Sequence, residues 1–103
     1  MNSVSVPIEE MQAGASQACR LLKVLSNPDR LLILCRLAEG ETTVGQLEES
    51  LGIRQPTLSQ QLTVLREEAL VSTRREGKNI YYRIDSPQAQ AVIRTLHQQF
   101  CNP

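Results

Sequence analysis

Apolar residues recur at alternating steps of three and four in the first part of the chain, the spacing of one face of an α-helix. This pattern predicts a helix over residues 8–25. A second helix is predicted to begin at Pro28, with Asn27 as its cap, and to end at Gly40. The apolar positions are Ile8, Met11, Ala15, Ala18, Leu22 and Leu25 in the first helix and Leu31, Leu34, Cys35 and Ala38 in the second.

Two shorter helices are predicted to follow. Thr43 and Gln46 have the spacing of a capping box, which predicts a helix over residues 44–51. After about three more residues the next helix is predicted, with Pro56 in its first turn and its end near Glu68. Its apolar stripe consists of Leu58, Leu62 and Leu65.

From residue 71 the pattern changes to two β-prone runs, 71–76 and 80–84, which predict a hairpin joined by residues 77–79. A final helix is predicted to begin at Pro87. Its cap is Asp85 or Ser86, and its apolar side consists of Ala89, Val92, Ile93, Leu96 and Phe100. Four helices, a hairpin and one more helix (ααααββα) predict a mainly α winged helix-turn-helix, in which the hairpin is the wing.

The composition is that of a folded protein, and the length predicts a single domain over residues 1–103. Hydrophobic residues make up 41% and charged residues 21% of the chain, which excludes disorder as the main state. Apolar runs are far shorter than the roughly 20 residues of a membrane-spanning helix, and Met1 to Ile8 does not resemble a signal peptide. We therefore expect a cytoplasmic protein with no membrane partner.

Charge is segregated although the chain is neutral overall. Residues 1–53 carry four basic and seven acidic side chains, whereas residues 54–83 carry six basic and three acidic ones. A local positive field of this kind can bind phosphate.

The predicted helix after residue 56 has an exposed side made almost entirely of amides and hydroxyls, which can hydrogen-bond base edges and phosphates. The alternative interpretation is an ordinary solvated face, although such a face more often uses Glu and Lys, which are better helix formers. The candidate DNA-binding residues of this segment are Gln55, Thr57, Ser59, Gln60 and Thr63.

Basic residues lie on both sides of this helix. Arg54 and Arg66 are predicted to contact phosphates, and Arg74, Arg75, Lys78 and Asn79 cluster on or near the hairpin. A charged hairpin can also serve only to prevent edge-to-edge aggregation. Together with the polar helix, the cations favour binding of double-stranded DNA, with affinity that falls steeply as salt rises.

Three segments resemble the ArsR-type winged-helix repressors, and the resemblance extends over nearly the whole chain. They are residues 25–31 at the start of the second helix, 55–66 in the predicted recognition helix, and Gly77-Lys78-Asn79-Ile80-Tyr81-Tyr82 in the wing. The resemblance implies a homodimer whose first and last helices pack across a two-fold axis. It also implies an inverted-repeat operator and release of DNA when an inducer binds.

Many members of that family sense metal ions, but this sequence contains few side chains that could bind one. Residues 43–51 contain no cysteine, His97 is the only histidine, and the three cysteines form no CxxC pair. A zinc site with nitrogen ligands needs three or four such groups. We therefore expect no metal and no other cofactor.

The cysteines that remain resemble those of the sulfur-responsive branch of the family, the BigR, SqrR and YgaV type. In that branch two thiols, here Cys35 and Cys101, react with persulfides or oxidants and become linked directly or through a sulfur chain. Cys35 could instead be core filler, and packing is the default interpretation of Cys19. The alternative function is an arsenite or other thiolate-metal response that uses Cys19, Cys35 and Cys101.

Two other classes of protein are disfavoured. An enzyme is not expected, because the chain has no phosphate loop and a nucleophilic Cys35–His97 pair lacks a third orienting group. A module that dimerises without binding DNA remains the other alternative. It would keep its self-association and show no loss of DNA affinity when Gln60 and Thr57 are replaced by alanine.

Overall fold

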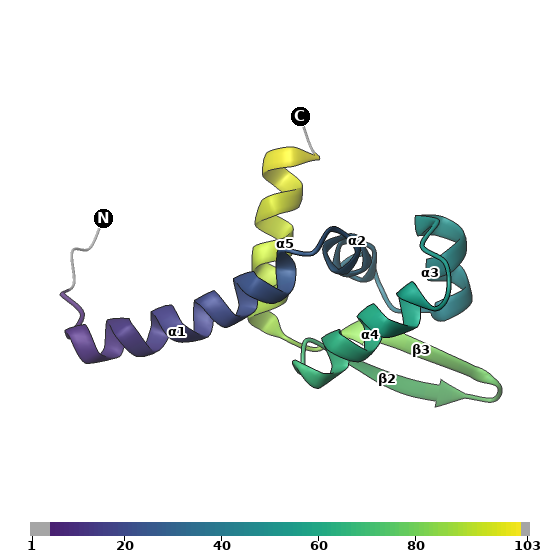
Figure 1. Cartoon of the computed structure of the whole chain (residues 1–103), viewed down its shortest axis with the longest axis horizontal. Coiled ribbons are helices and arrows are strands. Elements are labelled where there is room, and N and C mark those ends of the chain that lie inside the picture. Colours follow the sequence, from purple (N-terminus) through teal and green to yellow (C-terminus); the bar gives the residue numbers. More distant parts are fainter. Residues whose placement is uncertain (1–4, 102–103) are drawn as a thin grey trace.

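A computed structural model describes residues 5–101 and shows a mainly helical chain with a small antiparallel sheet. This confirms the predicted winged helix-turn-helix architecture (Figure 1). Its elements are α1 Ile8–Leu25, α2 Pro28–Leu37, β1 Thr42–Thr43, α3 Val44–Leu51, α4 Thr57–Glu67, β2 Val71–Glu76, β3 Asn79–Ile84 and α5 Pro87–Phe100.

α2, α3 and α5 begin where their capping residues predict, whereas α4 begins at Thr57, so that Pro56 precedes its first turn as the N-cap residue. Asn27 accepts a hydrogen bond from the backbone N–H of Arg30 at the start of α2, and Thr43 forms the reciprocal capping box with Gln46 at the start of α3. Of the two caps predicted for α5, Ser86 is the one used, because its hydroxyl oxygen accepts from the backbone N–H of Ala89 at 3.1 Å.

The sheet has the strand order β1-β3-β2. β2 and β3 form the predicted hairpin, the wing (residues 71–84), but its turn is one residue shorter than expected because Asn79 pairs with Glu76 in the ladder. Gly77 supplies the left-handed backbone, φ +62°, that this tight turn requires. β1 was not predicted, since two residues are too short for a periodic signal; Thr43 pairs there with Tyr81.

The core gathers around α4 and α2. The predicted stripe of α4 is confirmed, with Leu58, Leu62 and Leu65 almost fully buried. The stripe predicted for α2 was too narrow, because Ile33 and Leu37 are buried as well. The helix contacts α1, α3, α4, α5 and β3, so it is covered on more than one side.

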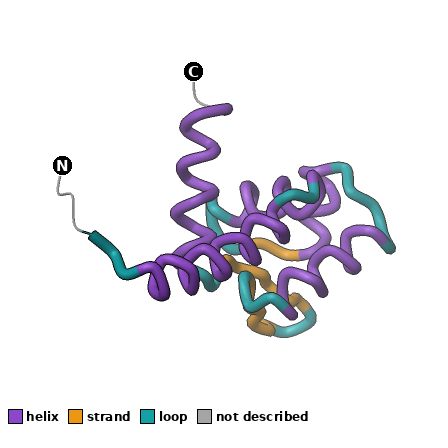
Figure 2. Tube along the Cα trace, turned by 60° about the vertical axis from the view of Figure 1, so that its left-hand side comes forward, coloured by secondary structure: helices purple, strands orange, loops and turns teal. Residues whose placement is uncertain are grey.

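Much of the terminal helices lies outside this core. The exposed fractions are 58% for Ile8, 55% for Met11 and 81% for Phe100, so these residues of the predicted apolar faces do not face the core of their own protomer. Figures 1 and 2 show α1 and α5 projecting from the body in different directions. The radius of gyration is 15.6 Å, whereas a compact domain of this length has about 13 Å.

Candidate nucleic-acid interface and cysteine site

The predicted polar face of α4 is open to solvent. Ser59, Gln60 and Thr63 are exposed, and Thr57 is half-buried. Gln55 precedes the helix, and its side-chain oxygen accepts from the backbone N–H of Ser59 at 3.2 Å, so it orders the first turn. The hydroxyl of Thr63 donates to the Ser59 carbonyl at 2.9 Å. Gln55 and Thr63 are thus fixed by the helix itself.

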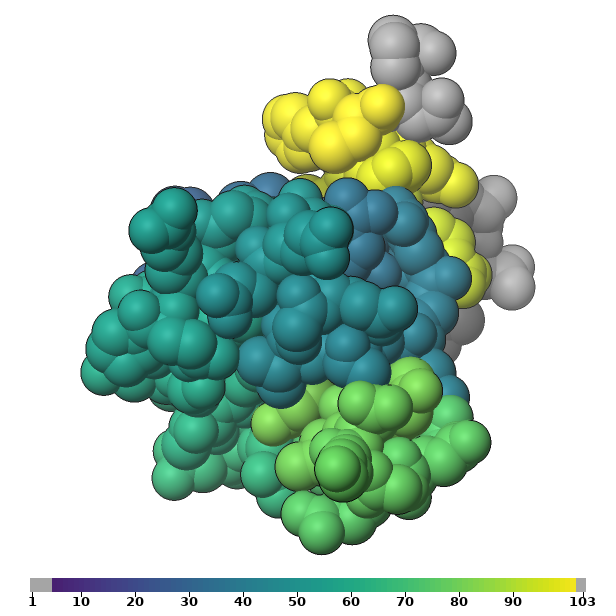
Figure 3. All heavy atoms as spheres, turned by 90° about the vertical axis from the view of Figure 1, so that its right-hand side faces the viewer, coloured from purple at the N-terminus to yellow at the C-terminus, as the bar shows by residue number. Residues whose placement is uncertain are grey.

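Basic side chains flank this face and continue onto the wing. Figure 3 shows one end of the molecule, where α3 and α4 in teal lie beside the wing in green. In that view the end of α5, in yellow, lies at the top, and the wing lies at the bottom. The candidate phosphate contacts Arg54, Arg66, Arg75, Lys78 and Asn79 are all exposed.

Arg74 differs from the other wing cations because acidic partners hold it. Its Nε donates to Glu41 at 2.9 Å, a second nitrogen pairs with Glu76, and the guanidinium lies 4.5 Å from the centre of the Tyr81 ring. The hydrogen bond from Arg74 lowers the pKa of the Glu41 carboxyl. Arg74 therefore ties the wing to the segment before β1. Local periodicity could not reveal this, because the partners Arg74 and Glu41 are 33 residues apart.

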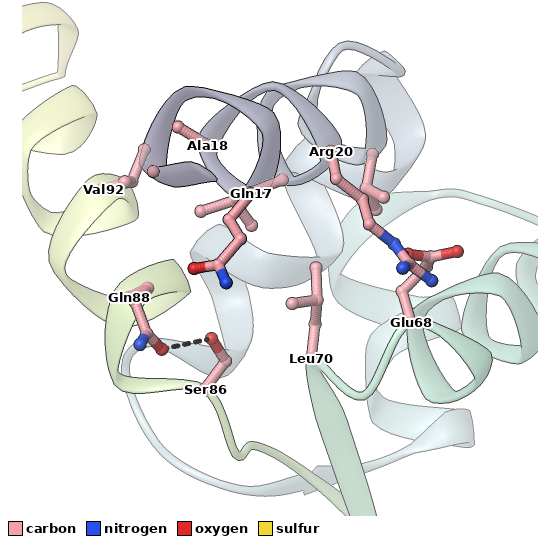
Figure 4. A pocket seen from close by; sticks show the side chains of 11 residues that line it. Gln17, Ala18, Arg20, Glu68, Leu70, Ser86, Gln88 and Val92 are labelled. Carbon is pink, nitrogen blue, oxygen red and sulfur yellow. Dashed lines mark hydrogen bonds and ion pairs between the residues drawn. The ribbon is translucent and has the colours of Figure 1, made fainter. Parts of the chain in front are cut away.

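A hollow of about 420 Å³ lies between α1, the end of α4 and the start of α5. Figure 4 shows Gln17 and Ala18 on one side, Ser86, Gln88 and Val92 on another, and Arg20 reaching Glu68 at the rim. None of the three cysteines lines it.

A smaller hollow of about 320 Å³ lies between α2 and α5, and Cys35 is one of the residues that line it. Cys35 is half-buried there against the core, while His97 and Arg94 of α5 line the opposite side. Cys101 is exposed at the end of α5. Burial raises the pKa of the Cys35 thiol, and the charges of Cys101 and Glu39 raise it further. Cys101 lies one turn beyond His97, whose carbonyl accepts from the backbone N–H of Cys101 at 2.8 Å.

Cys19 has a different environment. It is exposed on α1, so it does not fill space in the core of its own protomer. Within residues 5–101 no group of three His, Cys, Asp or Glu side chains is placed to hold a metal ion. No helix in the same range is both long and apolar enough to cross a membrane.

Comparisons with known proteins find the same fold and related sequences. Residues 27–73 match the family model described as "Bacterial regulatory protein, arsR family". A "Biofilm growth-associated repressor" of Agrobacterium fabrum is 50% identical, over 95% of this chain and 84% of that protein. The "Transcriptional activator HlyU" of Vibrio cholerae is 39% identical, over 91% of this chain and 87% of that protein. The crystal structure of the transcriptional repressor BigR from Xylella fastidiosa superposes with a TM-score of 0.86, at 48% identity over 92% of this chain and 94% of that one.

Proposed function

Because the chain belongs to the ArsR family of winged-helix DNA-binding regulators, we propose that it is a homodimeric transcriptional repressor with a thiol switch. In this proposal α4 and the wing bind an inverted-repeat operator. Reaction of Cys35 and Cys101 with reactive sulfur species or oxidants releases the DNA. Repression is preferred to activation because the 50% identical relative is named a repressor, whereas the relative named an activator is 39% identical.

The apolar surface of the terminal helices supports the homodimer. Ile8 and Met11 on α1 and Phe100 on α5 are exposed in the single protomer. Large apolar side chains grouped on projecting helices typically mark a protein interface. A second copy packed across α1 and α5 would cover them and leave the opposite end, with α4 and the wing, free.

The DNA-binding surface follows from the exposed polar face of α4 between basic residues. Gln60 is suited to address a base edge, because a glutamine amide can form two hydrogen bonds with adenine. Arg54 and Arg66 lie near opposite ends of the same helix, and Lys78 lies at the tip of the wing. These cations would contact the phosphates on either side of the groove that α4 enters.

The switch is supported by the placement of the two thiols: Cys35 lines the hollow between α2 and α5 together with His97, and Cys101 lies one turn beyond His97. The Cys35 thiolate attacks the outer sulfur of a hydropersulfide RSSH, which forms a Cys35 persulfide and releases RSH. The Cys101 thiolate then attacks the Cys35 sulfur and displaces hydrogen sulfide, leaving a disulfide. The cysteines are oxidised by two electrons and the added sulfur is reduced; further persulfide molecules would lengthen the link.

Linking the cysteines would join α2 to the end of α5. Since α5 belongs to the proposed dimer interface and α2 contacts α4, the link would change how the dimer holds its two α4 helices. The half-sites of such an operator lie roughly 34 Å apart, so a small change in spacing weakens both sets of contacts.

The alternative, a trithiolate response to arsenite, has less support. It needs Cys19 beside Cys35 and Cys101, and the described residues contain no such cluster. An inter-protomer arrangement of thiols would be revealed by the experiment below.

Operator binding before and after persulfide treatment tests the switch. A duplex selected in vitro from random sequence with the reduced protein serves as the probe. We expect treatment to weaken binding at least about tenfold in the wild type and in Cys19→Ser, and to change nothing in Cys35→Ser or Cys101→Ser. An equal response in Cys35→Ser would remove the dithiol switch. Arsenite release that is lost in Cys19→Ser would establish the alternative.

A further inference from the structure

Arg30, at the start of α2, joins three helices through its hydrogen bonds. Its backbone N–H donates to the Asn27 side chain at 3.0 Å, which caps α2. Its Nε donates to the carbonyl of Val24 at 2.7 Å, in the last turn of α1. Its Nη1 donates to the side-chain oxygen of Gln61 on α4 at 3.0 Å.

An arginine suits this position for physical reasons. The last carbonyls of a helix have no partner within the helix and carry a partial negative charge, so a cation near Val24 is stabilised. The rigid guanidinium fork can donate in two directions at once, toward α1 and toward α4. Arg30 is half-buried, and its hydrogen bonds are correspondingly better shielded from water than those of an exposed pair.

The hydrogen bond from Arg30 holds the Gln61 side chain on the side of α4 that faces the body of the protein. It is half-buried, whereas the neighbouring Gln60 is exposed on the proposed DNA-binding face. The two adjacent glutamines therefore have different tasks: Gln60 faces outward, and Gln61 fixes the helix to the body.

α1 and α4 have a second polar link between Arg20 and Glu68, 3.0 Å apart (Figure 4). This pair is more open to solvent, since the Arg20 side chain is 76% exposed. Exposed ion pairs contribute little. Arg30 therefore provides the better shielded connection between the two helices.

We infer that Arg30 is a positioning residue that sets the orientation of α4 relative to α1 and thereby the placement of the two DNA-binding helices in the dimer. The inference rests on the proposed function, in which α1 forms the dimer and α4 reads the operator. Neither residue of the Arg30–Gln61 pair touches DNA in this account.

A double-mutant cycle on the full-length protein tests this inference, with the in vitro selected duplex as the probe. Arg30→Met and Gln61→Met should each weaken binding about tenfold, and the double variant should be no weaker than either single variant. Arg30→Lys keeps the charge but lacks the planar guanidinium fork that spans the two acceptors, and should be intermediate. Gln61→Glu keeps the acceptor and should bind like the wild type at matched salt.

Three further measurements separate positioning from other roles. The slope of affinity against salt should stay unchanged in Arg30→Met, because a lost phosphate contact would lower it by about one. The dimer dissociation constant should also stay unchanged. Arg36→Met is the matched control on the same helix, since the Arg36 guanidinium pairs with Glu39 three residues away, and it should bind normally.

Additive effects of the two substitutions, or unchanged affinity in Gln61→Met, would overturn the inference. If Arg30→Met lowers the melting temperature, its DNA affinity is set aside, and the inference is decided by comparing the DNA affinities of Gln61→Met and Gln61→Glu. Gln60→Ala measured in parallel separates the two proposals. Unchanged binding in Gln60→Ala rejects DNA reading by α4, whereas weakened binding together with an additive cycle rejects only the role of Arg30.

Discussion

At the scale of single residues, the environment of Cys35 determines which reagents can reach and use its thiol. Burial and the charges of Cys101 and Glu39 raise its pKa above the ordinary value of 9.0, so little thiolate exists near neutral pH. A raised pKa makes Cys35 a slow nucleophile toward general electrophiles.

Removing one negative charge near Cys35 should speed its alkylation. In a Cys19→Ser, Cys101→Ser background, Glu39→Gln should increase the rate of iodoacetamide modification at pH 8, because the pKa of the Cys35 thiol falls toward 9.0 and the thiolate fraction rises. The rate should continue to climb above pH 9.0 in both proteins. Mass spectrometry of modified Cys35 gives the rates, and Glu67→Gln, on α4, serves as the control. An identical rate in Glu39→Gln and its parent contradicts this electrostatic explanation.

At the scale of elements, α4 and the wing should make separable contributions to DNA binding. Gln60→Ala should cost about 1–3 kcal/mol on the selected duplex, with the salt slope retained, because a base contact is lost. Lys78→Ala should weaken binding to all duplexes alike and lower the salt slope by about one, because a phosphate contact is lost.

Fluorescence anisotropy titrations at several salt concentrations measure both effects. Thr95→Ala provides the control, since the Thr95 hydroxyl donates to a carbonyl of its own helix, α5. Variants of Gln60 and Thr57 that still dimerise and bind DNA as the wild type does would instead support an interaction module.

Elements were more predictable from the sequence than the contacts between them. Helix starts carry their own local signals, and the caps Asn27, Thr43 and Ser86 all hold the helices that follow them. The pairs Arg74–Glu41 and Arg30–Gln61 join residues 33 and 31 positions apart, so no local pattern contains them. Helical spacing placed Phe100 on an apolar side but could not say what covers that side; its exposure in the single protomer agrees with the packing of the last helix across a two-fold axis that the family resemblance implies.

At the scale of the whole molecule, the projecting terminal helices make the protomer longer than a compact domain, with extents of 51 × 33 × 23 Å. An apolar face that no part of the protomer covers favours association. In the proposed dimer, the same association sets the distance between the two DNA-binding ends.

A charge placed on the exposed apolar face of α1 should therefore separate the protomers. Met11→Glu should weaken the dimer by about a hundredfold or more, because two methionine side chains lose their burial and two charges are buried or brought together. Operator affinity should fall with it, while the helical circular dichroism signal remains. Sedimentation velocity gives the dissociation constant. Ala13→Glu adds the same charge to the opposite face of α1 by helical spacing and should stay dimeric; a dimeric Met11→Glu protein would show that α1 lies outside the interface.

The two-residue strand β1 couples the wing to the helix-turn-helix. Thr43 is at once the last residue of β1, the cap of α3 and a partner of Tyr81 in the wing. The hairpin therefore cannot tilt without moving the start of the helix-turn-helix. We expect each protomer to dissociate from DNA as a rigid unit, so that the contacts of α4 and of the wing are lost together and not one after the other.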